Sequence, residues 1–246
     1  MLVGLLTACA KTVPLQPVSS GPTILTVLTW NMHGGRGDLG RLISDLETGR
    51  LTGAAARDYI LLLQEFVDCE GAVRSTSRPL TVFASPVRGA SSNAIIATTR
   101  LDDARTVDLP RERQPRAAVG ATVRIGGESL FVVSTHLENR LGWLRGLFGD
   151  RARGRQAEAL LRALPQGRGI VGGDFNTMLG PDEPAWKALL ARFPDTPDRP
   201  EPTFRDRLVL DHLFFDLPDG WVVSRQVIKD QYGSDHHPVL ANLHAR

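Results

Sequence analysis

Ile170-Val171-Gly172-Gly173-Asp174-Phe175-Asn176 is the stretch that decides how this chain folds, because a short apolar run ends there in polar side chains. The same pattern recurs in three other places, which are Thr29-Trp30-Asn31, Leu61-Leu62-Leu63-Gln64-Glu65 and Leu208-Val209-Leu210-Asp211. It occurs in reverse order in Ser234-Asp235-His236-His237-Pro238, which the apolar pair Val239-Leu240 follows. Polar groups at the ends of buried strands tend to meet at one edge of a sheet, where functional sites form. Carboxylates, amides and imidazoles gathered there can hold a hard divalent cation and activate water.

Length and composition indicate one large soluble-type domain. The chain has 246 residues, of which 42% are hydrophobic and 23% charged, and these are ordinary values for a globular α/β protein. A net charge of +2 excludes a strongly basic nucleic-acid binder of the histone kind but permits local basic patches. Two cysteines, Cys9 and Cys69, give little support for a disulfide scaffold. No apolar run approaches the ~20 residues of a membrane span.

The N-terminal segment resembles a bacterial lipoprotein signal that ends in Leu6-Thr7-Ala8-Cys9. The basic region that normally precedes such a segment is missing, so either the natural start lies upstream or this is only an apolar N-terminus. Residues 1–22 are therefore read as a truncated signal and a tether rich in Pro and Ser, and residues 23–246 as the catalytic domain. If Cys9 carries lipid, we expect a membrane-anchored protein of the bacterial cell envelope, and otherwise a cytoplasmic one. We expect a monomer.

The apolar periodicity predicts strands and helices in mixed order. Leu39, Leu42, Ile43 and Leu46 form one face of a helix, for which Asp38 is a candidate N-cap. Further helices are predicted at about 151–164 and 182–191. Strands are predicted at 24–30, 59–64, 80–84, 94–98, 117–125, 130–135, 169–172, 208–215, 221–228 and 239–243. A hairpin around Gly126-Gly127 excludes a purely parallel, doubly wound sheet.

Six blocks in this order resemble the endonuclease/exonuclease/phosphatase superfamily of deoxyribonuclease I-like, metal-dependent phosphoesterases. The resemblance runs from about Ile24 to Leu243. It implies an α/β (α+β) four-layer sandwich, with two mixed β-sheets packed face to face and helices outside. It also implies a Mg²⁺-dependent hydrolase, with Mn²⁺ as a second candidate, that cleaves phosphodiester bonds by attack of an activated water. The substrate stays open between nucleic acid and phospholipid, and a phosphomonoesterase or a non-catalytic binding module are the alternatives.

The resemblance implies a metal site at three of the polar residues. Glu65 matches the principal ligand of the family, Asn31 lies beside the metal, and Asp235 completes the site. Oxygen and amide ligands favour a hard cation over zinc. The alternative for Glu65 is a surface carboxylate at the end of a strand.

The catalytic groups follow from the same resemblance. Asp174 orients or deprotonates the attacking water, and Asn176 donates to the developing oxyanion. Two positions apart on an extended segment, these side chains would point the same way, whereas the alternative is an Asx turn. The glycines before them allow the backbone to approach the substrate closely. His236 contacts the scissile phosphate, and Asp211 accepts a hydrogen bond from its other ring nitrogen, which favours the cation. His212 and His237 are read as structural.

His136 matches a family histidine that contacts phosphate or protonates the leaving group. The deoxyribonuclease branch pairs this histidine with a Glu ahead of the strand corresponding to 94–98, but this chain has no acid between Glu70 and Asp102. Phosphate contact is therefore expected of His136, and a general-acid role is not. The acid-free stretch carries Arg74, Arg78 and Arg88, which we predict to form a positive rim that attracts the anionic substrate.

The segment around Trp143 is the expected source of substrate choice. Trp143, Leu144, Leu147 and Phe148 would gather on one side of a helical turn, and several arginines surround them, including Arg151, Arg153 and Arg155. Three interpretations stay open, namely contact with an anionic lipid surface, stacking on single-stranded nucleic acid, and a small satellite core.

Two motifs point elsewhere and are set aside. Gly35-Arg36-Gly37-Asp38-Leu39-Gly40 matches the dinucleotide-binding G-x-G-x-x-G pattern, but its first glycine comes too late after the strand for a tight turn, and the later hairpins contradict a parallel sheet. Asp235-His236-His237 is similar to the motif of the DHH phosphoesterases, in which it occurs early in the chain beside Asp-rich blocks that this sequence lacks.

Overall fold

The structure is a computed structural model that describes residues 24–68, 76, 78–85, 92–139, 146–197 and 201–245. The predictions for the signal and tether at 1–22 with Cys9, for Cys69, Arg74 and Arg88, and for Trp143 lie outside the described residues. No helix in the described part is long and apolar enough to cross a membrane.

The first sheet has six strands in the order β10-β11-β1-β2-β4-β3. Its strands are β1 (Ile24–Asn31), β2 (Asp58–Gln64), β3 (Thr81–Ala84), β4 (Asn93–Ala97), β10 (Trp221–Val227) and β11 (Val239–Ala245). Strands β1 and β2 are parallel, and their other neighbours in this sheet are antiparallel. Every residue of β2 after Asp58 is buried, which explains its uninterrupted apolar sequence, because a central strand with both faces covered does not alternate.

The second sheet has five strands in the order β5-β6-β7-β8-β9. Its strands are β5 (Asp102–Leu109), β6 (Arg116–Ile125), β7 (Glu128–His136), β8 (Gly169–Asp174) and β9 (Asp211–Asp216). Strands β6 and β7 form the predicted hairpin, with Ile125 opposite Glu128 across the glycine pair. Strand β5 was not predicted from the sequence, because it is an exposed edge strand with a polar sequence.

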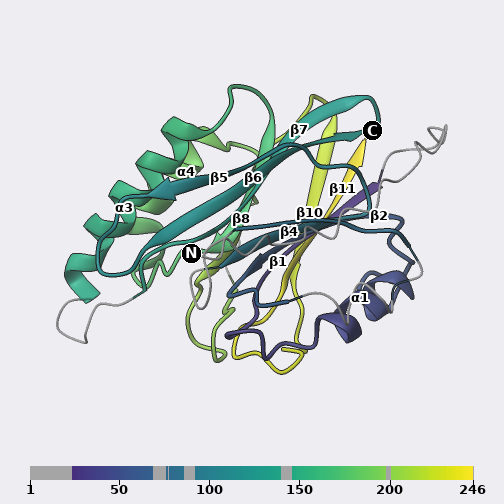
Figure 1. Cartoon of the computed structure of the whole chain (residues 1–246), viewed down its shortest axis with the longest axis horizontal. Helices are drawn as coiled ribbons and strands as arrows, with labels where there is room; N and C mark the ends of the chain where they lie inside the picture. Colours follow the sequence, from purple (N-terminus) through teal and green to yellow (C-terminus); the bar gives the residue numbers. More distant parts are fainter. Residues whose placement is uncertain are drawn as a thin grey trace, which may run out of the picture.

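The helices cover the outer faces of the two sheets (Figure 1). Helix α1 (Leu39–Glu47) packs its four predicted apolar residues against the first sheet. Helices α3 (Gly146–Ala163) and α4 (Pro184–Arg192), with the 3₁₀ turn η1 (Gly180–Asp182) before α4, lie against the second. The inner faces of the sheets share a third apolar cluster. The predicted four-layer α/β sandwich is confirmed, and so is the Asp38 N-cap, whose side chain accepts from the Arg41 N–H at 2.9 Å.

The strand directions bring the polar ends of both sheets to one edge of the sandwich. Asn31 pairs with Gln64 at the ends of the parallel strands β1 and β2. His136 pairs with Asp174 in the same way at the ends of β7 and β8. Asp211 lies opposite Asp174, but it opens the antiparallel strand β9. The predicted strand at 208–215 was therefore too long, although an antiparallel strand that starts at Asp211 brings the carboxylate to the same edge.

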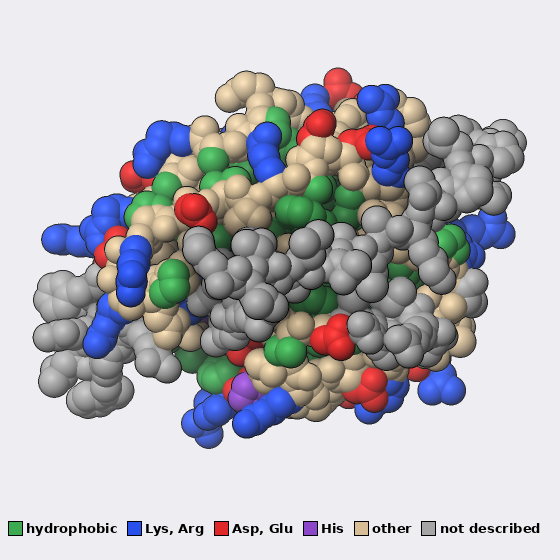
Figure 2. All heavy atoms as spheres, in the orientation of Figure 1, with side chains coloured by type: hydrophobic (Ala, Val, Ile, Leu, Met, Phe, Trp, Pro, Cys, Tyr) green, Lys and Arg blue, Asp and Glu red, His purple; other side chains and the backbone are tan. Residues whose placement is uncertain are grey.

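Charges of both signs alternate over the face drawn in Figure 2 and form no broad field of one sign on its described part, in line with the net charge of +2. Two of the arginines that were predicted to surround the Trp143 segment make ion pairs within the described part of the chain. Arg153 is fully buried and makes a bidentate ion pair with the equally buried Glu183, at 2.7 and 2.8 Å. Arg155 pairs with Glu112 at 2.8 Å. Position 153 falls on the inner face of α3, where a charge requires a partner.

Replacing Arg153 by Met should lower the free energy of unfolding by about 3–5 kcal/mol, because the buried Glu183 carboxylate would keep no cation. Urea unfolding followed by circular dichroism measures the change. The double variant Arg153→Met/Glu183→Leu is the control and should regain most of the loss, since two apolar side chains leave no buried charge. Equal losses in the single and the double variant would show that packing, not charge, causes the effect.

Candidate active site

The carboxylate of Asp174 is the centre of a buried polar cluster at the shared edge of the two sheets. Its Oδ2 accepts a hydrogen bond from Asn31 Nδ2 at 2.9 Å, and it lies 3.4 Å from His136 Nε2 and 3.8 Å from His236 Nε2. Its Oδ1 accepts from the backbone N–H of Asn176 at 3.0 Å. All these side chains are buried. The structure thus brings together residues from four separate sequence blocks.

The predicted pair of His236 and Asp211 is present, with Nδ1 of the ring 2.8 Å from Oδ2 of the carboxylate. Phe204 covers the ring of His236, at 4.7 Å between centroids. The Thr203 hydroxyl accepts from the backbone N–H groups of Leu210 and Asp211 at 3.0 Å, which positions the start of β9. The sequence analysis did not identify Thr203 or Phe204, since neither type of residue signals such a role by itself.

Burial and neighbouring charges set the protonation of this cluster. Burial, and then the charge of Asp211, raise the pKa of Asp174 to about 7. Burial opposes the charge of His236, but the carboxylates of Asp211, Asp174 and Asp235 outweigh it and raise the pKa of the ring to about 9. The cluster therefore combines a carboxylate that exchanges protons near neutral pH with an imidazolium held beside it, which suits acid–base work.

His136 is fully buried, and burial, followed by the charges of Arg116 and His236, holds its pKa well below the usual range. Neither ring nitrogen has a hydrogen-bond partner. At the start of β4, the side chain of Asn93 donates to Ala117 O at 2.5 Å. A neutral His136 agrees with the expectation that it is not a general acid.

The loop 110–115 brings a buried arginine to the site, and the sequence analysis missed this residue. Arg116 opens β6 at the same edge and is buried near His136. The loop before it is held by the buried carboxylate of Glu138, which accepts the N–H groups of Arg113 and Gln114 at 2.9 and 3.1 Å. A buried Arg next to the cluster is a signal that only three-dimensional proximity reveals, because Arg is frequent throughout this sequence.

Glu65, the predicted cation ligand, lies at the end of β2. It follows β2 directly with a left-handed φ of 52° and is only partly buried. Its carboxylate has no hydrogen-bond or ion-pair partner in the described part of the chain, which is the condition that a cation would satisfy. Asn31 presents Oδ1 to the His33 N–H at 2.9 Å, and Asp235 lies 3.3 Å from both His33 Nδ1 and Arg205 Nη2.

Asp174, Asp211 and His236 form a second group that could hold a metal, since one ligand atom of each lies within 4.8 Å of the others. His236 bonds Asp211 through Nδ1, and its Nε2 lies 3.8 Å from Asp174 Oδ2. A histidine that ligates a metal usually donates its other ring N–H to a carboxylate in this way. This group is therefore a second candidate metal site, in addition to the predicted ligands Glu65, Asn31 and Asp235.

Two local details differ from the sequence-based expectation. Asn176 has a φ of 52° and donates its backbone N–H to Asp174 Oδ1, so the segment is the Asx turn that was the alternative, and not an extended one. The side-chain amide of Asn176 donates to Leu137 O at 3.2 Å, and an NH₂ group has a second hydrogen for a substrate.

A Cβ on Gly173 would meet Thr135 O at 2.1 Å, and one on Gly172 would meet Leu62 at 2.6 Å. These glycines therefore permit close packing of strands, not approach of a substrate.

Arg78 does not belong to the site. Its Nη1 donates to the backbone oxygen of Arg57 at 2.8 Å, just before β2 begins. The functional edge lies at the other end of this strand, about 20 Å away at roughly 3.3 Å per residue. The predicted positive rim is therefore wrong for Arg78, because β3, which follows it, starts at the opposite edge.

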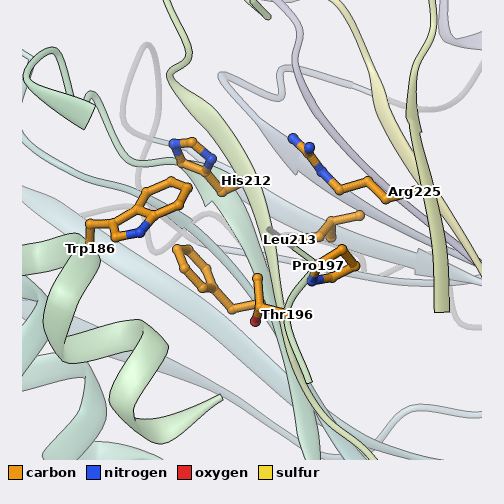
Figure 3. A pocket seen from close by; sticks show the side chains of 7 residues that line it. Trp186, Thr196, Pro197, His212, Leu213 and Arg225 are labelled. Atoms are coloured by element: carbon orange, nitrogen blue, oxygen red, sulfur yellow. The ribbon is translucent and has the colours of Figure 1, made fainter. Parts of the chain in front are cut away.

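A small pocket lies along β9 and is lined by residues from both sheets and from α4 (Figure 3). Its interior of about 10 Å³ holds roughly one water molecule, and none of its lining residues is a candidate site residue. His212 lies in the wall of this pocket, and its Nε2 forms a hydrogen bond of 2.9 Å with Thr177 Oγ1. Its ring packs against Trp186, with 4.2 Å between the ring centroids. His237 contacts Ile228 O at 3.0 Å and Asp206 at 2.9 Å. Both contact sets agree with the structural roles expected of these histidines.

Comparisons with known proteins give the same fold. The model of the "Endonuclease/Exonuclease/phosphatase family" matches residues 28–236. A humanized D. rerio TDP2 superposes with a TM-score of 0.67 at 17% identity, covering 89% of this chain and 98% of that chain. The human Nocturnin catalytic domain with bound sulfate superposes with a TM-score of 0.65 at 19% identity, covering 90% of this chain and 93% of that chain. Sphingomyelinase C from Streptomyces griseocarneus superposes with a TM-score of 0.62 at 17% identity, covering 92% of this chain and 100% of that chain. Among curated proteins no match was found.

The burial of His212 predicts a pH dependence of stability. Burial, followed by the charge of Arg225, lowers its pKa well below 6.5, so the native ring stays neutral while the unfolded chain binds a proton as the pH falls below about 6.5. Its contribution is therefore complete above pH ~6.5 and is lost on acidification, by about 1.4 kcal/mol at pH ~5.5. His212→Phe should reduce by that amount the difference in unfolding free energy between pH 7.5 and pH 5.5.

Urea titrations at the two pH values measure this difference. His244→Gln, which replaces a half-buried histidine of β11 near the opposite edge, is the matched control and should leave the difference unchanged. An unaltered difference in His212→Phe would mean that His212 takes up its proton normally in the native state.

Proposed function

Because the chain belongs to the endonuclease/exonuclease/phosphatase family, whose members are generally hydrolytic phosphoesterases, we propose that it hydrolyses phosphodiester bonds with a divalent metal ion. The observation that carries this proposal is the buried cluster in which Asp174 meets Asn31, His136 and the His236–Asp211 pair. Such a cluster offers a proton acceptor, an amide donor and a cationic donor within one small volume.

In the proposed reaction the oxygen of a water attacks phosphorus and the bond to the leaving oxygen breaks. Asp174 orients the water and takes its proton, for which a pKa of about 7 is suited. His236, whose charge Asp211 supports, donates to a phosphoryl oxygen as negative charge builds up there. Asn176 donates its free amide hydrogen, and Arg116 and His136 line the same edge. The leaving oxygen takes up a proton from solvent, and the proton on Asp174 returns to solvent, so that one water is consumed in all.

We assign Mg²⁺, with Mn²⁺ as the alternative, to Glu65, Asn31 and Asp235. When bound, the metal would neutralise the charge on the phosphoryl and leaving oxygens. Glu65 would be the main ligand, because its carboxylate lacks another partner. Asp235 would exchange its contacts with His33 and Arg205, which are exposed enough to move aside.

The substrate could be a nucleic acid or a phospholipid, and a phosphomonoester is the third candidate. The similar structures include a sphingomyelinase and a mannosyl-6-phosphatase, so the shared fold serves different substrates. Plasmid DNA, single-stranded oligonucleotide, sphingomyelin, phosphoinositide and bis-p-nitrophenyl phosphate form the panel that separates these classes. No turnover of any of them would favour a non-catalytic binding module. A lipid anchor at Cys9, the cell envelope as location and a monomeric state remain part of the proposal.

Exhaustive treatment with EDTA should abolish hydrolysis of bis-p-nitrophenyl phosphate, and Mg²⁺ or Mn²⁺ should restore it, because the proposed ligands Glu65, Asn31 and Asp235 offer hard oxygen atoms. Initial rates before and after dialysis measure the effect, and Zn²⁺ is the control, which should restore less activity. Full activity after complete metal removal would contradict the metal assignment.

Asp174→Asn and His236→Ala should each lower kcat by at least about a hundredfold, as the loss of acid–base or oxyanion groups usually does. Glu65→Gln should mainly raise the Mg²⁺ concentration at half-maximal rate. His244→Gln, far from the cluster in β11, is the control for an effect unrelated to the site. If all three site variants match the parent at saturating metal, the catalytic residues are misassigned.

A further inference from the structure

Few large apolar side chains are exposed in the described part of the chain, and most of them follow candidate site residues within three positions of the sequence. They are Val67, Met178, Leu179 and Leu190, with exposed fractions of 63, 40, 48 and 36%. Val67 is two residues beyond Glu65, and Met178 and Leu179 are two and three residues beyond Asn176. Only Leu190 lies elsewhere, on helix α4. Exposed apolar side chains scattered singly need no explanation, but here three of four follow site residues.

The loop that carries Met178 and Leu179 is held in place by several bonds. The Met178 N–H donates to Asn176 O and the Gly180 N–H to Thr177 O, both at 2.9 Å. The Thr177 hydroxyl contacts the buried ring of His212 at 2.9 Å. The Leu179 N–H donates to a carboxylate oxygen of Glu183 at 2.9 Å. The two apolar side chains are therefore presented to solvent by an ordered backbone.

The group that fixes this loop is costly to bury. Glu183 is fully buried, and its carboxylate binds both Arg153 and the Leu179 N–H. A buried ion pair adds little to stability compared with an apolar pair of similar size, and it is better suited to fixing one geometry. The geometry that it fixes here is that of an exposed aliphatic tip directly after Asn176. The tip is therefore held in one position at the end of a segment that carries site residues.

We propose that Met178 and Leu179 bind an aliphatic group of the phosphoester substrate, so that the preferred substrate carries an alkyl or acyl chain close to the scissile phosphate. This inference rests on the proposed phosphoesterase function. Continuity with the site supports it, because the tip follows Asn176 directly. An aliphatic group is favoured over a nucleobase at this tip, because base binding uses aromatic stacking platforms, and the two side chains that the tip presents, Met178 and Leu179, are aliphatic.

The test uses the full chain with Mg²⁺ and two substrates that differ only in the alkyl group, methyl p-nitrophenyl phosphate and octyl p-nitrophenyl phosphate, both below micelle formation. The parent should hydrolyse the octyl ester with a kcat/KM roughly tenfold higher, since several methylene groups leave water. Met178→Ser/Leu179→Ser should bring the ratio of the two kcat/KM values close to one, mainly through a higher KM for the octyl ester. Its rate on the methyl ester should stay at the parent level.

Leu190→Ser is the matched control, because it removes a similarly exposed leucine from α4, and it should keep the parent's octyl preference. The melting temperatures of both variants should equal that of the parent, since the replaced side chains are exposed. Lost octyl preference in the double variant alone supports the inference. A change of the same size in Leu190→Ser would overturn it.

The failure of the inference is distinguishable from that of the proposed function. Equal hydrolysis of both esters by the parent overturns the inference and leaves the phosphoesterase function standing. No hydrolysis of either ester counts against both. Thymidine 5′-p-nitrophenyl phosphate is the third substrate, and if the double variant loses activity only toward it, the loop contacts a nucleobase and the aliphatic proposal is wrong.

Discussion

The buried carboxylate of Asp174 is the group on which the arrangement of this molecule depends. A carboxylate out of contact with water is tolerated only where donors and positive charge surround it. Here the contacts come from both sheets, because Asn31 at the end of β1 donates to Asp174 Oδ2, while Oδ1 accepts from the Asn176 N–H and His136 at the end of β7 lies 3.4 Å away. The two sheets must therefore keep one fixed relative position for the Asp174 carboxylate to keep its hydrogen bonds. The requirement that stabilises the buried charge is the same one that builds a reactive centre.

A second polar contact between the sheets, just beneath the site, supports that alignment. Gln64 at the end of β2 donates to the Ser134 hydroxyl of β7 at 3.0 Å, and Ser134 donates to Leu63 O at 2.8 Å. Such a bond between two otherwise apolar faces specifies their relative position more sharply than hydrophobic packing does. Gly172 contributes by size, because any side chain there would meet Leu62 and Leu213. Alignment of the sheets and geometry of the site are in this way coupled.

Helix α3 connects the loops at this edge to the core. Gln156 accepts the Glu138 N–H at 2.8 Å and donates to Pro110 O at 3.0 Å, which holds the loop ahead of Arg116. One turn earlier, Arg153 holds Glu183 and with it the loop after Asn176. A single helix thus sets the position of two loops on either side of the cluster. Differences in such loops, on a shared core, explain how one fold serves different substrates.

The sequence by itself determined the layers, most strands and the residues of the cluster, because apolar periodicity and polar residues at strand ends are local signals. It missed β5, since an exposed edge strand carries no apolar pattern, and it misplaced Arg78 and Arg153, since the spacing of charges does not tell which face or edge they occupy. Only the tertiary structure decided that Arg116 and Glu138 border the site, that Asp174 and Asn176 form an Asx turn, and that burial keeps His136 neutral. These properties depend on burial and on neighbours distant in sequence, which no local pattern encodes.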